Sequence, residues 1–138
     1  MRKDLSAITC RLCLPLFLVW LSGCGAKQAA LADTGVIRLE NQAMGKVYVA
    51  WSDAHEVEGG FLVTGVVRRK DTVGPPIKAI VDVEVVSPGG AVLDKAQSDS
   101  LYVPHRKASR IQGFERFSVR FSKMPPEGSS VRIVARGS

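Results

Sequence analysis

Apolar and polar residues alternate along four separate stretches of the chain after Val36. A period of two residues predicts strands that bury one face and leave the other in solvent. A fifth stretch, 61–67, is apolar and β-branched, and Gly65 interrupts it, which predicts a bulge at that glycine. Shorter runs at 36–40 and 91–96 bring the total to about seven strands. The four alternating stretches are 46–51, 81–85, 117–121 and 131–136.

Glycine and proline residues lie between these predicted strands, at 58–60, 71–76, 87–90 and 124–129. They indicate turns, because glycine accepts positive φ, and proline fixes φ and lacks an N–H donor. No helix of ordinary length is required between them. We therefore predict an all-β domain, an antiparallel β-sandwich of two sheets, with a small open barrel as the alternative.

This layout is similar to immunoglobulin-like and fibronectin type III-like domains, with Trp51 on an early strand as the candidate for a buried core tryptophan. The sequence differs from antibody domains in lacking a cysteine pair in this region. A tyrosine corner is not assigned, since Tyr102 lies in a loop-like segment. Such folds host many functions, so the resemblance implies a fold and not an activity.

The N-terminal residues have the pattern of a targeting segment. Arg2, Lys3 and Arg11 precede the uncharged and mostly apolar run 12–21. A positive region followed by an apolar region is typical of a signal peptide. The run is shorter than the ~20 residues that span a bilayer as a helix, so we expect a signal helix that is removed.

A short motif follows this run, Leu21-Ser22-Gly23-Cys24, and it resembles the lipobox of bacterial lipoproteins. The resemblance covers about the first 25 residues. It implies that the Cys24 thiol accepts a diacylglyceryl group and that signal peptidase cuts between Gly23 and Cys24. Two or more acyl chains anchor a protein durably. Gly25 stands where an aspartate would retain a lipoprotein at the inner membrane, which favours the outer membrane, facing the periplasm. An ordinary signal peptide with an incidental cysteine is the alternative.

The chain therefore divides into a signal peptide at 1–23, a lipidated N-terminus with a flexible tether at 24–35, and a β-sandwich domain at 36–138. A length of 138 residues suits one domain, and 46% hydrophobic with 23% charged residues favours a folded core. Cys10 and Cys13 leave with the signal, so no disulfide or thiol catalyst is expected. Loss of three basic residues and one acidic residue with the signal lowers the net charge from +6 to +4.

The densest set of possible metal ligands lies at 53–58. On a strand, Asp53 and His55 share one face while Glu56 and Glu58 share the other, so too few ligands converge for a closed metal site. Motifs for a serine nucleophile, a zinc protease or a phosphate loop are missing. We predict no enzyme, no metal and no cofactor beyond the covalent lipid. The alternative is a small periplasmic enzyme or a ligand- or metal-binding protein with a site near His55 or His105.

Basic residues cluster in three places. They are the end of the predicted strand 61–67, with Arg68, Arg69 and Lys70; the long loop after residue 103, with Arg106, Lys107 and Arg110; and the last two predicted strands, with Arg116, Arg120, Arg132 and Arg136. Arg120 and Arg132 are the candidates for contact on the strands. If 114–122 and 130–136 paired as a hairpin, these two arginines would share a solvent face. A positive face attracts anionic lipid, peptidoglycan carboxylates or an acidic envelope protein. A solvated surface that keeps a small β-protein soluble is the alternative.

Nucleic acid is not the expected partner. The site would lie outside the cytoplasm, and the aromatic residues Phe117 and Phe121 are predicted to point inward, where they cannot stack on bases. The tether at 24–35, as a flexible coil of about ten residues, would span roughly 17–19 Å and keep the domain near the membrane. We therefore expect a non-catalytic, membrane-anchored envelope lipoprotein that binds or scaffolds another envelope component.

Overall fold

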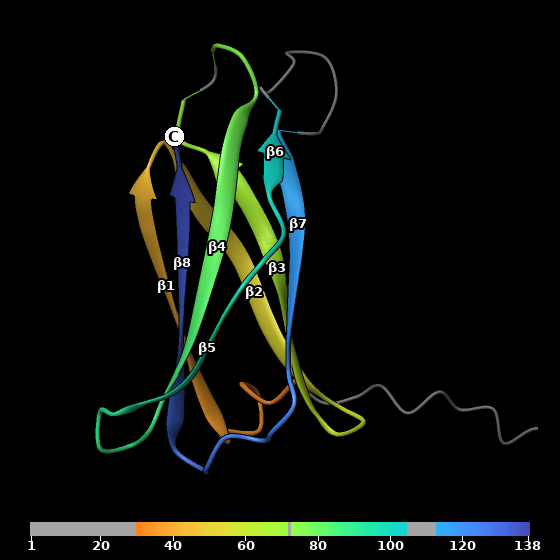
Figure 1. Cartoon of the computed structure of the whole chain (residues 1–138), viewed down its shortest axis with the longest axis vertical. Coiled ribbons are helices and arrows are strands. Elements are labelled where there is room, and N and C mark those ends of the chain that lie inside the picture. The colour runs from red at the N-terminus through yellow and green to blue at the C-terminus, as the bar shows by residue number, and fades with distance from the viewer. Residues whose placement is uncertain (1–29, 72, 105–112) are drawn as a thin grey trace, which may run out of the picture.

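We describe a computed structural model of the chain, in which residues 30–71, 73–104 and 113–138 are placed (Figure 1). These residues form eight β-strands and no helix. The predicted all-β class is therefore confirmed for this part of the chain. The strands are β1 (Ile37–Gly45), β2 (Val47–Val57), β3 (Gly60–Arg69), β4 (Ile77–Val86), β5 (Val92–Gln97), β6 (Leu101–Val103), β7 (Phe114–Phe121) and β8 (Ser129–Gly137).

The strands form two sheets. In the large sheet the order is β1-β8-β4-β5, and β6 also pairs with β4, beyond the end of β5. The small sheet has the order β2-β3-β7. Figure 1 shows β1, β8 and β4 as one layer in front of β2 and β3. The two-sheet, sandwich-like architecture is thus confirmed, and the immunoglobulin-like type stays a prediction.

Two details of the predicted topology are wrong. Strand β1 runs parallel to β8, from Ile37 opposite Ser129 to Gly45 opposite Gly137, so the sandwich is not purely antiparallel. The predicted hairpin of the last two strands does not form, because β7 pairs with β3 while β8 pairs with β4 and β1. Each of these two strands buries apolar side chains on its inner face, and the two strands belong to opposite sheets instead of lying side by side in one sheet.

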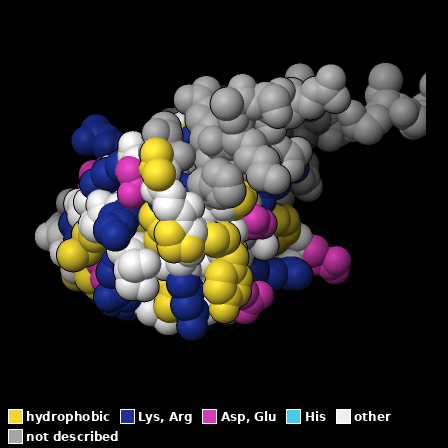
Figure 2. All heavy atoms as spheres, turned by 90° about the horizontal axis from the view of Figure 1, so that it is seen from above, with side chains coloured by type: hydrophobic (Ala, Val, Ile, Leu, Met, Phe, Trp, Pro, Cys, Tyr) yellow, Lys and Arg dark blue, Asp and Glu magenta, His cyan; other side chains and the backbone are white. Residues whose placement is uncertain are grey.

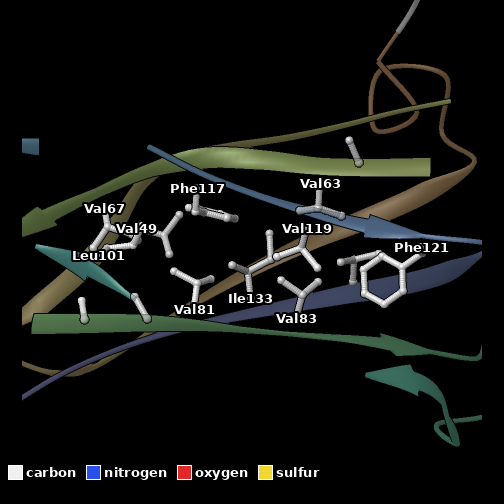
Figure 3. Packing of buried hydrophobic residues seen from close by; sticks show 14 of the residues in the cluster. Val49, Val63, Val67, Val81, Val83, Leu101, Phe117, Val119, Phe121 and Ile133 are labelled. Carbon is white, nitrogen blue, oxygen red and sulfur yellow. The ribbon is translucent and has the colours of Figure 1, made fainter. Parts of the chain in front are cut away.

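The core lies between the sheets (Figure 3). Phe61 of β3 and Phe121 of β7 stack with ring centroids 4.8 Å apart and ring planes 11° from parallel. Aliphatic side chains from both sheets fill the remaining space, as alternation predicts for strands with one buried face. Those shown and labelled include Val63, Val81, Val83, Val119 and Ile133, all buried.

A bulge in β2 changes which face its side chains occupy. The register with β3 shifts between Val49 and Trp51, so Val49 and Ala54 are both buried although they are an odd number of residues apart. Trp51 is consequently turned outward and is 53% exposed. The expectation of a buried Trp51 is therefore wrong, and the bulge predicted at Gly65 lies on the neighbouring strand.

Gly65 has a different role, because its backbone packs closely against two neighbours. A Cβ atom at this position would lie 2.5 Å from the carbonyl oxygen of Trp51 and 2.6 Å from Cε1 of the Phe117 ring. Both distances are too short for any side chain. The glycine thus lets the middle strand of the small sheet pass under the bulge and against the core.

The described part of the chain begins at Ala30. This residue forms an antiparallel bridge with His55, and the Leu31 N–H donates to the carbonyl oxygen of Ala54 at 2.7 Å. Leu31 is 6% exposed and belongs to the core. The last residues of the predicted tether, 30–35, therefore pack against β2 as a turn. The predicted signal helix lies outside the described residues.

Candidate binding surface on the small sheet

The outer face of the small sheet carries side chains that alternate with the buried ones on β2, β3 and β7. We call these outward side chains the small-sheet face. Because the three strands are in register, they form rows across the sheet. The rows are Tyr48–Arg68–Phe114, Trp51–Val66–Arg116, Asp53–Thr64–Ser118 and His55–Leu62–Arg120.

Three arginines make this face positive. The guanidinium carbon of Arg68 lies 5.9 Å from the centre of the Phe114 ring, a cation–π contact. Arg120 donates from Nη2 to the carbonyl oxygen of Glu58 at 2.6 Å. Among the described residues, neither these two nor Arg116 has a carboxylate within ion-pair distance.

Asp53 is the one carboxylate in the four rows, and it is engaged locally. Its Oδ1 accepts from the Ala54 N–H at 2.7 Å, and its Oδ2 lies 3.6 Å from Nδ1 of His55. The sequence correctly placed Asp53 and His55 on one face. No further ligand joins them, since the described residues contain no group of three His, Cys, Asp or Glu side chains that could hold a metal ion.

A groove of about 530 Å³ lies at the centre of the small-sheet face. Trp51 and Arg116 line it from the two outer strands, and Thr64 and Val66 line it from the middle strand. Ser118 lies beside them on β7. The lining therefore combines an exposed indole, aliphatic atoms, hydroxyls and a guanidinium, which suits recognition of a group with an apolar part and a negative charge.

The outer face of the large sheet, called here the large-sheet face, has paired charges. Glu84 of β4 binds two cations, with Lys95 Nζ at 3.0 Å from Oε1 and Arg132 Nη1 at 3.4 Å from Oε2. Arg136 of β8 forms an ion pair with Asp82. Arg132 thus lies in the other sheet from Arg120, so the shared face predicted for these two arginines is wrong.

The remaining predicted contact residues cannot be compared with the structure. Arg106, Lys107, Arg110 and His105 lie outside the described residues, as does Cys24 with the lipobox. Figure 2 views the molecule end-on and shows Lys and Arg side chains on several of its sides, with apolar side chains between them. Within the described ranges, no helix is long and apolar enough to cross a membrane.

Sequence reasoning missed Trp51 as a surface residue, although the sequence contains a signal for it. Trp51, Asp53 and His55 are two residues apart along β2, so regular alternation puts their side chains on the same side of the strand. Asp53 and His55 are polar, which indicates that this side faces outward and that Trp51 faces outward with them.

Comparisons of the chain with protein-family models, with curated proteins and with solved structures found no match.

Proposed function

We propose that this protein is a non-catalytic lipoprotein of the bacterial envelope, anchored by lipid at Cys24, that uses its small-sheet face to bind another envelope component. An immunoglobulin-like type for the sandwich is part of the proposal. The observation that carries it is the exposed Trp51 among three arginines without carboxylate partners in the described structure. Aromatic residues and arginine are enriched in the cores of protein interfaces, whereas a purely solvated surface requires no exposed indole.

The chemistry of the groove supports binding rather than catalysis. Its polar groups are the hydroxyls of Thr64 and Ser118 and the guanidinium of Arg116. A guanidinium does not act as a general base, and no described lining residue carries a carboxylate or an imidazole. Asp53 lies in the row of Thr64 and Ser118, but its oxygens face the Ala54 N–H at 2.7 Å and His55 Nδ1 at 3.6 Å. The His55 imidazole lies in another row, beside Leu62 and Arg120.

The proposed anchor would hold the domain close to the membrane. Ala30, the first described residue, bridges to His55 of the domain and lies six residues after Cys24 in the sequence. A fully extended segment of that length spans about 20 Å. Confinement to a membrane surface raises the effective concentration of the domain near a partner in the same envelope, so a weak contact suffices. The outer membrane, with the domain facing the periplasm, is the proposed location.

The lipid anchor is tested by Cys24→Ser in the full chain. We expect this substitution to abolish incorporation of radiolabelled palmitate and to move the protein out of the membrane fraction, because the acylated thiol is lost. Cys13→Ser is the matched control, since it removes a cysteine of the signal segment and should keep both label and location. Retention of the Cys24→Ser protein in washed membranes would show that the anchor is wrongly assigned.

The binding surface is tested by photocrosslinking in intact cells. A photoreactive amino acid replaces Ser118 on the small-sheet face or Gln42 on the large-sheet face, both exposed in the structure. We expect a discrete adduct from position 118 and none from position 42. Equal adducts from both positions, or none from position 118, would refute the small-sheet face as the contact surface.

A further inference from the structure

We infer that the small-sheet face binds an acidic segment of a partner protein, which inserts one apolar side chain beside Trp51 and places carboxylates on the surrounding arginines. This inference rests on the proposed function and specifies the class of partner. It combines two independent features of the face, the groove and the spacing of its charges.

The groove provides the apolar contact. Trp51 on β2 and Arg116 on β7 are separated by one strand, hence by about 10 Å. Val66 and Thr64 lie between them on β3 and line the floor. One aliphatic or aromatic side chain fits into this space, with the indole on one side and the methylene groups of the arginine on the other. Tryptophan and arginine are the residues most often found as energetic hot spots of protein interfaces.

The arginines provide the charge contacts at a spacing that an extended peptide matches. Arg116 and Arg120 are four residues apart on β7, about 13 Å along the strand. In an extended ligand, side chains at positions i, i+2 and i+4 face the same way with the same spacing. An apolar side chain at position i, in the row of Trp51 and Arg116, would therefore place a carboxylate at i−2 in the row of Arg68 and another at i+4 in the row of Arg120. Guanidinium groups bind carboxylates with two parallel hydrogen bonds.

Two other occupants fit this face less well. In a second copy of the chain, a symmetric contact between two small-sheet faces would bring Arg68, Arg116 and Arg120 of each copy together, and like charges in an interface are unfavourable. An anionic lipid surface would satisfy the charges and accept the indole at its interface, but a flat surface would leave the groove beside Trp51 without a side chain to fill it. The acidic protein segment satisfies both features.

Trp51 itself reports binding. The chain contains two tryptophans, Trp20 and Trp51, so the full chain with Trp20→Phe has a single indole fluorophore, which lies at the groove and is excited selectively over the tyrosines. We would purify this chain in detergent and titrate it with the peptide Ser-Asp-Ser-Asp-Thr-Phe-Thr-Asp-Ser-Asp-Ser. We expect a saturable shift of the indole emission to shorter wavelength, because the phenylalanine excludes water from the groove. Raised salt should weaken the binding.

Matched variants separate the two contacts. Changing phenylalanine to alanine in the peptide, or Arg116→Ala in the protein, should each weaken binding by about tenfold or more. Arg38→Ala is the control, because it removes an exposed arginine from β1 on the large-sheet face and should change the dissociation constant by less than about twofold. Equal affinity for the phenylalanine and alanine peptides would refute the groove as the contact site.

The alternative occupants give different results. If the emission shift appears on reconstitution in phosphatidylglycerol vesicles but not in phosphatidylcholine vesicles, and the peptide causes none, the ligand is lipid and the inference is wrong. A shift that depends on protein concentration alone would indicate a second copy, and would also overturn it. A position-118 adduct in cells whose attached group is lipid or glycan by mass spectrometry would likewise contradict a protein partner while leaving the proposed contact surface intact.

Discussion

The arginines on the outer faces of the two sheets differ in whether they contact a carboxylate. On the large-sheet face, Arg132 and Arg136 each contact a carboxylate of β4, and Lys95 shares Glu84 with Arg132. On the small-sheet face, Arg68 lies over an aromatic ring and Arg120 donates to a carbonyl oxygen. Within the described structure, neither these two arginines nor Arg116 forms an ion pair with a carboxylate. Both faces are exposed sheet surfaces of the same small domain, so the difference is one of charge placement and not of fold.

This difference indicates which cations serve the fold and which are available to a partner. Exposed ion pairs contribute about 0–1 kcal/mol each, whereas removing one partner of a buried pair costs more, because it leaves an uncompensated buried charge. Asp82 is 5% exposed, so its ion pair with Arg136 is one in which the carboxylate is buried. Arginines without an opposite charge add repulsion within the domain, but they keep their hydrogen-bond donors free for an external carboxylate.

The largest effect on stability is expected at Arg69, which follows Arg68 in the sequence. The Arg69 side chain points inward and is 4% exposed. Its guanidinium donates to Asp71 and to the carbonyl oxygens of Val73, Gly74 and Pro75, and so holds the loop between β3 and β4. Arg69→Ala should lower the free energy of unfolding by about 3 kcal/mol, because the hydrogen bonds of a buried guanidinium to the loop and the packing of its side chain are lost together. Urea denaturation measures this loss.

Two substitutions show whether the loss of stability comes from the hydrogen bonds of the buried Arg69 guanidinium. Arg69→Lys keeps the charge but not the planar set of donors, so it should still lower the unfolding free energy by about 2 kcal/mol. Arg68→Ala removes the outward neighbour and should lower it by about 0.5 kcal/mol, as expected for an exposed cation–π contact. Similar losses for Arg68→Ala and Arg69→Ala would remove the distinction between bound and free arginines.

The second effect concerns the buried carboxylate of the large-sheet face. Arg136→Ala should lower the unfolding free energy by about 2 kcal/mol, because Asp82 keeps only the Gln97 amide, which donates to Oδ1 at 2.5 Å. The loss stays below that of a fully buried pair, since half of the Arg136 side chain is exposed. Thermal and urea denaturation both measure it.

A second substitution tests the cause. Adding Asp82→Asn to the Arg136→Ala chain removes the uncompensated buried charge and should restore part of the lost stability. Asp82→Asn alone measures the cost of that substitution when Arg136 is present. If Asp82→Asn lowers the unfolding free energy by the same amount in the Arg136→Ala chain, the two residues are not coupled, and the large-sheet face is not stabilised through its charges.

The sequence predicted the strands well because their signal is local. Alternation and turn residues are both properties of neighbouring positions, and strands β2, β3, β4, β7 and β8 lie where these signals predict them. Strand β6 was missed, since its three residues are too few to show alternation. Sheet membership was missed too: alternation shows that β7 and β8 each bury one face, but not whether the two strands lie beside or opposite each other.

The candidate surface was harder to predict because it depends on one inserted residue. A single bulge after Val49 moves Trp51 from the core side of β2 to the outer side, whereas a period of two continued from Val47 and Val49 puts it inward. Arg120 and Arg132 have the same alternation and both face outward, yet their opposite environments come from the carboxylates of β4. Those neighbours are set by pairing between distant segments, which a local pattern does not contain.

The smallest effect on stability is expected when the small-sheet face loses its charge. A chain with Arg68→Gln, Arg116→Gln and Arg120→Gln should unfold within about 1 kcal/mol of the unchanged chain, because the lost cation–π and carbonyl contacts are offset by relief of repulsion. Lys95→Gln, Arg132→Gln and Arg136→Gln together remove the same charge from the large-sheet face and should cost about 3 kcal/mol, since Asp82 and Glu84 lose their partners. Urea denaturation of both chains at equal salt compares the two faces directly. Equal costs would mean that the small-sheet arginines stabilise the fold as much as the paired cations do, and the case for reserving them for a partner would fail.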